Sequence, residues 1–159
     1  MRLLPYIQSA FYRYATEGIP PFRAPIVDYP DEAESWHRDD QILIGDRLMA
    51  APLSGEATNR PVWLPPGTWA DFWSGEPLEG NRVIEVVAPP ERLPLFVKSN
   101  SVLPLATATA HTDDPSSFEL EVRIYGDRSL SMPLVEEPDD NLPFHPDRVT
   151  RLDVSSHAR

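Results

Sequence analysis

Three pairs of adjacent aspartates are the residues of this 159-residue sequence that most suggest acid–base chemistry: Asp39–Asp40, Asp113–Asp114 and Asp139–Asp140. Two carboxyl groups can hydrolyse a glycosidic bond when they flank it from opposite sides. Adjacent residues do not provide that arrangement, and each pair lies beside turn residues, where Asp side chains commonly bind backbone N–H groups. We therefore interpret the pairs as turn residues and predict no catalytic residue among them.

The sequence has four widely separated histidines, at His37, His111, His145 and His157. They form no metal-binding spacing such as His-Glu-x-x-His. His37, close to Asp39 and Asp40, is interpreted as part of a solvated turn. Motifs for a serine nucleophile, a phosphate loop or a dinucleotide are also absent. The sequence predicts neither a metal site nor a cofactor.

Tryptophans are concentrated in the stretch 62–75, VWLPPGTWADFWSG, which contains Trp63, Trp69 and Trp73. Aromatic side chains on strands usually pack into a core, and burial is the first interpretation. The alternative is a substrate-binding surface, because the faces of indole rings suit the apolar faces of sugars. Both interpretations stay open at this point.

Composition excludes several classes of partner. The formal net charge is −11, and no basic cluster is present, so neither nucleic acid nor an anionic membrane surface is expected as a partner. There is no cysteine, which excludes disulfides and thiolate chemistry within the chain. No apolar run is long enough to span a membrane and no signal peptide is recognised, which favours a cytoplasmic location.

The elements that would position these residues are mostly short strands, as 19 prolines against 7 glycines indicate. One helix is expected over residues 3–17, with Leu4, Ile7, Phe11 and Tyr14 on its apolar face and Gly18 at its end. Strands are expected at 22–29, on both sides of Gly45-Asp46 within 42–53, at 61–65 and 82–89, and on both sides of Ser99-Asn100 within 93–105. A further strand, 118–126, alternates cleanly, so Phe118, Leu120, Val122 and Ile124 are expected on its buried face.

Three phrases, taken together and in order, resemble a known family. They are LLPYIQSAFYRYATEGIPPFRAPIVDYPDE, DDQILIGDRLMAAPL and VWLPPGTWADFWSGEPLEGNRVIEVVAPPERLPLFVKSNSVLPL. They resemble the carboxy-terminal part of glycoside hydrolase family 31, the α-glucosidase and α-xylosidase family. The resemblance runs from Met1 to about Leu105. FELEVRIYG and SLSMPLVEEPDDN extend it more weakly, as the start of a distal β-domain.

The resemblance implies a mainly β fold, a β-sandwich preceded by a short α/β remnant of a (β/α)₈ barrel. Residues 1–50 would be the last helix and strand of the truncated barrel, and 51–105 the proximal sandwich. Residues 106–117 would be a linker, and 118–159 the truncated start of the distal domain. A complete barrel needs about 200 residues or more, so the chain is expected to be a piece of a longer protein.

The resemblance also implies a function. The family's nucleophile lies in a Trp-x-Asp-Met-Asn-Glu type motif that is absent here, and its acid/base Asp and late substrate-binding His lie upstream of anything matching this chain. We therefore expect the scaffold part of a retaining α-glycosidase, inactive alone, which meets its α-glycoside through the absent barrel or through a separate upstream chain. The alternative is a stand-alone carbohydrate-binding or protein-interaction module that uses Trp63, Trp69 and Trp73.

Overall fold

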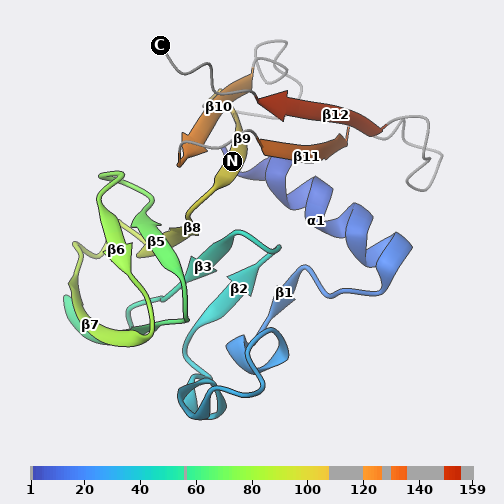
Figure 1. Ribbon diagram of the computed structural model, residues 1–159. Helices are drawn as coiled ribbons and strands as arrows, with labels where there is room; N and C mark the ends of the chain where they lie inside the picture. The colour runs from blue at the N-terminus through green and yellow to red at the C-terminus, as the bar shows by residue number, and fades with distance from the viewer. Residues whose placement is uncertain (1, 56, 108–119, 127–129, 136–148, 155–159) are drawn as a thin grey trace. The chain divides into compact units, whose positions relative to one another are not determined.

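The computed structural model describes residues 2–55, 57–107, 120–126, 130–135 and 149–154 (Figure 1). The fold is mainly β, with short antiparallel strands and one α-helix among the described residues. Contacts along the chain divide it into two compact units. The first unit comprises Met1–Pro21 and Asn100–Arg159, and the second comprises Phe22–Ser99. No helix in the described ranges is long and apolar enough to cross a membrane.

The second unit contains a six-stranded antiparallel sheet. In spatial order its strands are β1 (Phe22–Arg23), β2 (Ile42–Ile44), β3 (Leu48–Ala50), β8 (Leu95–Lys98), β5 (Thr68–Asp71) and β6 (Pro77–Glu79). The predicted turn at Gly45-Asp46 joins β2 and β3, and Gly45 adopts a positive φ of 58° that an L side chain rarely adopts. Strand β8 is central, because it pairs with β3 on one side and β5 on the other.

A second sheet of this unit is the antiparallel pair β4 (Asn59–Leu64) and β7 (Arg82–Val87). Residues from both sheets form one buried cluster: Leu43, Met49, Ala51, Val62, Leu64, Trp69 and Phe96. The inward side chains of two sheets thus make a common core, which is the arrangement of a β-sandwich.

The predicted strand over 22–29 is only partly correct. Extended pairing stops after Arg23, and a 3₁₀ helix, η1, follows at Pro25–Val27. Pro25 has no N–H to donate to a neighbouring strand. The Arg23 side chain is buried and holds the Asp28 carboxylate through two hydrogen bonds of 2.6 Å, which fixes the turned segment. A second 3₁₀ helix, η2, spans Ala33–His37.

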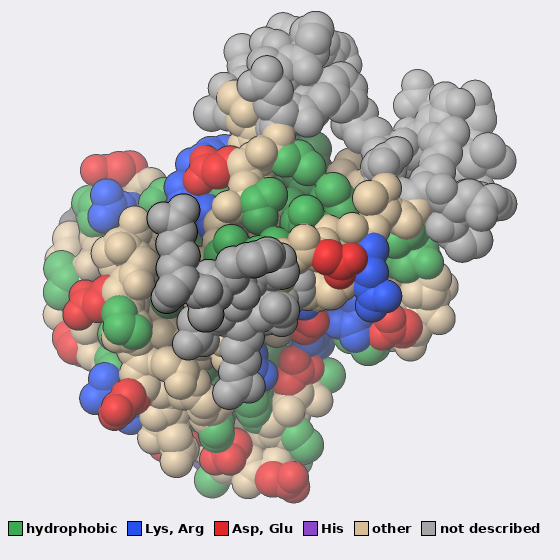
Figure 2. All heavy atoms as spheres, turned by 45° about the horizontal axis from the view of Figure 1, so that its top comes forward, with side chains coloured by type: hydrophobic (Ala, Val, Ile, Leu, Met, Phe, Trp, Pro, Cys, Tyr) green, Lys and Arg blue, Asp and Glu red, His purple; other side chains and the backbone are tan. Residues whose placement is uncertain are grey.

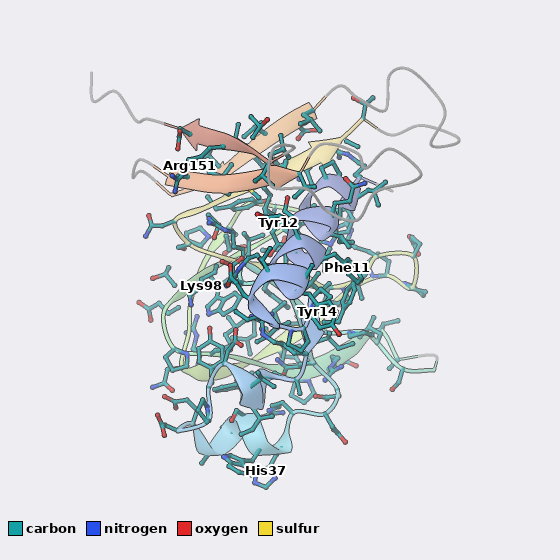
Figure 3. The ribbon with its side chains drawn as sticks, turned by 90° about the vertical axis from the view of Figure 1, so that its right-hand side faces the viewer. Phe11, Tyr12, Tyr14, His37, Lys98 and Arg151 are labelled. Atoms are coloured by element: carbon teal, nitrogen blue, oxygen red, sulfur yellow. The ribbon has the colours of Figure 1, made fainter. Side chains whose placement is uncertain are left out.

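The first unit begins with helix α1 (Leu4–Glu17), as the sequence predicted. Gly18 ends it in a left-handed conformation, where its N–H donates to the Tyr14 carbonyl. The expected face is wrong, however. The helix buries Pro5, Tyr6, Ser9 and Ala10 and lies against β9 and β11, while Phe11 and Tyr14 are exposed along its side (Figure 3). The small side chains of Ser9 and Ala10 permit close packing, and the Ser9 hydroxyl is satisfied by the Pro5 carbonyl at 3.0 Å.

The remaining strands of the first unit form two antiparallel pairs. Strand β9 (Ser101–Ala106) pairs with β10 (Leu120–Tyr125), and β11 (Leu130–Val135) pairs with β12 (Val149–Val154). The two apolar runs around Ser99-Asn100 are confirmed as strands β8 and β9, but they belong to different sheets. Asn100 between them takes a positive φ of 57°.

Strand β10 reverses the expected burial. Leu120, Val122 and Ile124 share one face, as the alternation predicted, but this face is exposed in the structure, whereas Tyr125 is buried. Phe118 lies outside the described residues. Alternation identifies the residues that share a face, and the packing of other elements decides which face is covered.

The predicted division into 1–50, 51–105, 106–117 and 118–159 stays a prediction, and most of 106–117 lies outside the described residues. Strands β1, β2 and β3, from the segment expected as a barrel remnant, join the same sheet as β5, β6 and β8 from the expected sandwich. Helix α1 is grouped with the strands that follow residue 99.

Candidate functional site around the tryptophan stretch

The stretch 62–75 begins in β4, turns at Pro66-Gly67 and continues through β5 into a second turn after Asp71. Gly67 adopts a φ of 116°, which the tight connection requires. Strand β5 ends at Asp71, so Trp69 lies in that strand and Trp73 lies in the second turn. The three tryptophans therefore occupy three different environments.

Trp63 lies in the interior of the second unit, with 1% of its surface exposed. The side-chain amide of Gln41, which is equally buried, makes two hydrogen bonds to the backbone of Trp63. The amide nitrogen of Gln41 donates to the Trp63 carbonyl at 2.8 Å, and the amide oxygen accepts the Trp63 N–H at 2.9 Å. Tyr29 meets the indole edge-on, with ring centroids 6.1 Å apart. Gln41 thus satisfies the β4 backbone as a neighbouring strand would, a role that the sequence analysis missed because no local motif marks it.

Trp69 is also 1% exposed and belongs to the shared core of the two sheets. Its indole N–H donates to the Pro65 carbonyl at 2.8 Å, which satisfies the polar end of the buried ring. Core packing is therefore confirmed for Trp63 and Trp69. Since a ligand contacts exposed atoms, these two rings offer no face to a sugar in this structure, and the carbohydrate-contact hypothesis depends on Trp73.

Trp73 is 46% exposed and held in one orientation. Its indole N–H donates to the Leu93 carbonyl at 2.8 Å, and Phe72 packs at right angles to it with ring centroids 5.1 Å apart. The guanidinium carbon of Arg92 lies 5.4 Å from the centroid of the indole, within the range of a cation–π contact.

The Asp71 carboxylate fixes the turn that carries Trp73. One of its oxygens accepts hydrogen bonds from the Trp73 N–H at 2.9 Å, from the Ser74 N–H at 2.7 Å and from the Ser74 hydroxyl at 2.9 Å. Gly75 closes the turn with its N–H on the Asp71 carbonyl at 2.8 Å. This is the Asx geometry in which Asp side chains stabilise turns, and it occupies the carboxylate nearest to Trp73 in sequence.

Several other carboxylates are held by arginines. Asp40 pairs with Arg60, which also donates to the Asp40 and Pro52 carbonyls at 3.1 and 2.6 Å. Glu34, in η2, accepts a hydrogen bond of 2.6 Å from Arg38, which directly follows η2. Asp40 thus links two segments of the chain, as a structural residue would, while Asp113–Asp114 and Asp139–Asp140 lie outside the described residues.

Two exposed carboxyl groups of the first unit have a shifted pKa. A hydrogen bond from Arg13 lowers the pKa of Glu17, and a hydrogen bond from Arg123 lowers that of Glu121. A catalytic acid requires the opposite shift, since it must keep its proton near neutral pH. Neither group therefore has the electrostatic environment of a catalytic acid.

His37 lies exposed at the end of η2, and the other three histidines lie outside the described residues (Figure 3). In the part of the chain that the structure describes, no three His, Asp or Glu side chains gather as metal ligands. On the coloured surface in Figure 2, Lys and Arg side chains lie beside Asp and Glu side chains in many places.

The geometry defines a class of protein domain: a mainly β domain whose core lies between two sheets and which carries an ordered, exposed Trp73. Residues 18–103 match the glycosyl hydrolase family 31 C-terminal domain. The chain belongs to glycosyl hydrolase family 31, as its motifs predicted.

Relatives in this family include enzymes acting on different glycosides. The chain is 38% identical over 106 residues to an isomaltosyltransferase from Sporosarcina globispora, a match covering 66% of the chain and 10% of that protein. It is 32% identical to alpha-glucosidase 2 from Bacillus thermoamyloliquefaciens over 77% of the chain and 16% of the relative, and 31% identical to an alpha-xylosidase from Saccharolobus solfataricus over 78% and 17%. The chain thus spans less than a fifth of the length of these relatives.

Solved structures agree with this assignment. A cycloalternan-forming enzyme from Listeria monocytogenes, in complex with a pentasaccharide substrate, matches 99% of the chain and 15% of its own length, with a TM-score of 0.83 and 28% identity. The alpha-xylosidase of Xanthomonas citri matches 85% of the chain and 15% of its own length, with a TM-score of 0.76 and 33% identity.

Proposed function

We propose that this chain is the C-terminal scaffold of a retaining α-glycosidase, and that sequence outside these 159 residues supplies the catalytic carboxylates. The observation that carries this proposal is the family match over residues 18–103 to a C-terminal domain, in a chain that spans 10% to 17% of the relatives described above. In a retaining enzyme, two carboxyl groups only about 5–5.5 Å apart form and hydrolyse a covalent glycosyl intermediate.

The side chains of the second unit support a scaffolding role. Arg23 with Asp28, Arg60 with Asp40, and the Asp71 turn use their charges to fix loops around the sandwich. The buried Gln41 and the core tryptophans make the same unit rigid. A rigid β-domain can stabilise a neighbouring barrel. In the whole enzyme, that barrel would bind the α-glycoside substrate.

A chimera tests the proposal. Residues 18–103 of this chain would replace the matching segment of the alpha-glucosidase from B. thermoamyloliquefaciens, and hydrolysis of p-nitrophenyl α-glucoside would be measured. We expect an active chimera, an inactive deletion of the same segment, and no hydrolysis by the 159-residue chain alone.

Two outcomes decide against the proposal. Hydrolysis by the isolated chain that disappears on substitution of its own carboxylates would show that it is catalytic. A deletion mutant of the relative with unchanged stability and rate would show that the segment is not a scaffold. As a control, Trp69→Ala in the chimera should reduce folding and activity together, because it empties a position in the shared core.

A further inference from the structure

We propose that Trp73 and Arg92 form a contact site for α-linked glucose oligosaccharides on the second unit. The choice of ligand class rests on the proposed function, because an α-glycosidase acts on α-linked sugars. The site itself rests on the geometry of a few described residues around the second turn of the tryptophan stretch.

The indole of Trp73 is ordered before any ligand binds. Its N–H is held by the Leu93 carbonyl, Phe72 packs against it edge-on, and the Asp71 carboxylate holds its backbone N–H. Almost half of the residue nevertheless remains in solvent, although burial would have been favourable for so large an apolar ring. An exposed and immobilised ring loses little conformational entropy when a ligand stacks on it.

Arg92 places hydrogen-bond donors beside this ring. A turn holds the residue, with its N–H on the Pro89 carbonyl at 2.9 Å, and its guanidinium lies over the indole. Within the described part of the chain, no carboxylate or carbonyl accepts a hydrogen bond from that guanidinium. An arginine carries five N–H donors in a planar fork. Arg92 can therefore donate hydrogen bonds to the hydroxyl oxygens of a ligand that stacks on the ring.

The combination favours a neutral saccharide. A pyranose ring offers an apolar face of C–H groups to an indole and a rim of hydroxyl oxygens to a donor. Leu93, whose carbonyl accepts the hydrogen bond from the Trp73 indole, is also exposed and adds apolar surface. Glu91, exposed and adjacent in sequence to Arg92, opposes the accumulation of positive charge that an anionic ligand would need.

Trp36 provides a matched control in the same unit. It is 68% exposed, and its indole N–H is also held by a carbonyl, that of Pro30 at 3.1 Å. Among the residues that the structure describes, no arginine lies over its ring and no aromatic ring packs perpendicular to it. If exposure of an indole were sufficient for saccharide binding, Trp36 would bind as well as Trp73.

The test uses the 159-residue chain, titrated separately with maltotetraose and isomaltotetraose while two-dimensional NMR follows the tryptophan indole N–H signals. Trp73→Phe and Trp36→Phe assign the two exposed indoles by loss of one signal each. We expect a saturable shift of the Trp73 signal with at least one of the two sugars and none of the Trp36 signal. The two sugars distinguish α-1,4 from α-1,6 linkage preference.

Variants then separate binding from folding. Arg92→Ala removes an exposed side chain whose guanidinium, among the described residues, contacts the Trp73 ring, so the fold should be retained and the affinity should fall about tenfold or more. Trp73→Ala should abolish the response, while Trp36→Ala should leave it unchanged. Unfolding temperatures of all variants verify that each comparison is made between folded proteins.

Three results would overturn the inference: no shift of the Trp73 signal with either sugar, equal shifts of the Trp36 and Trp73 signals, or binding that survives Arg92→Ala and Trp73→Ala together. Concentration-dependent sedimentation that Arg92→Ala abolishes, without any saccharide response, would assign the surface to protein contact instead. An active chimera together with a flat titration would refute this inference alone, whereas an inactive chimera would count against the proposed function.

Discussion

Replacing Gln41 tests the idea that one buried side-chain amide satisfies the backbone hydrogen-bonding groups of Trp63 in β4. Gln41→Ala removes the acceptor of the Trp63 N–H at 2.9 Å and the donor to the Trp63 carbonyl at 2.8 Å. Each buried backbone group left without a partner costs about 1–3 kcal/mol, so we expect the free energy of unfolding to fall by about 3 kcal/mol or more. Urea unfolding, followed by tryptophan fluorescence, measures it.

The fluorescence assay is specific to the relevant part of the chain. All four tryptophans lie between residues 22 and 99, and therefore report on the second unit. The matched control is Asn59→Ala, on the same strand, which removes an exposed hydrogen bond of 2.8 Å to Glu85. Because both of its groups are exposed to water, we expect a loss of about 0.5 kcal/mol or less.

A second substitution at the same site adds a dependence on pH. Gln41→Glu keeps an acceptor for the Trp63 N–H but directs a second oxygen at the Trp63 carbonyl. Burial raises the pKa of the introduced carboxyl above its unfolded value, so its stabilising, protonated form persists at low pH and is lost as pH rises through the folded pKa. The variant should therefore be closer to wild-type stability at pH 4 than at pH 7. A loss below about 1 kcal/mol for Gln41→Ala, similar to that of Asn59→Ala, would refute this account of the edge.

Three further predictions concern other positions. Arg60→Ala removes the partner of the Asp40 carboxylate and two bonds to backbone carbonyls, and should lower the free energy of unfolding by about 1–2 kcal/mol, seen as a lower urea midpoint. An unchanged midpoint would contradict the role of Arg60 as a link between the two segments. Gly80→Ala would place a methyl carbon against the Pro65 carbonyl and 2.6 Å from the Gly67 carbonyl, so we expect the variant to lose cooperative unfolding. The control is Gly18→Ala, whose methyl group would meet no atom within 4 Å. It should lower the free energy of unfolding by only about 1 kcal/mol, because of the positive φ at that position. Arg13→Ala should raise the pKa of Glu17 towards the ordinary value in an NMR titration, because the wild-type pKa is lowered chiefly by the Arg13 hydrogen bond. The wild-type pair stabilises the protein above the unfolded pKa of the carboxyl and loses that effect as pH falls through the folded pKa; a Glu17 pKa that does not respond would contradict this pairing.

Local features of the fold were accessible from the sequence. The limits of α1 follow from a proline tolerated in the first turn and Gly18 at the end, and the β2–β3 turn follows from Gly45-Asp46. The ordered family motifs predicted the family itself. These features depend on residues close together in the chain, whose conformational preferences act whatever packs around them.

The sequence did not predict in the same way which faces of a helix or strand are buried by other elements. The apolar stripe of α1 that includes Phe11 and Tyr14, and the β10 face of Leu120 and Ile124, have correct periodicity and yet remain exposed. Periodicity groups residues on a face through the geometry of one element. Burial of that face requires another element to pack on it, and distant parts of the chain decide whether one does.

The tryptophan stretch shows the same division. Sequence determined that three large aromatic side chains lie within fourteen residues, around the turn at Pro66-Gly67. Only the tertiary structure decided that Trp63 and Trp69 are buried, that Gln41 reaches the Trp63 backbone from 22 residues away, and that Trp73 stays exposed beneath Arg92. The reason is physical: hydrogen bonds and ring contacts depend on distances in space, and the packing of the two sheets sets those distances for residues that the chain keeps apart.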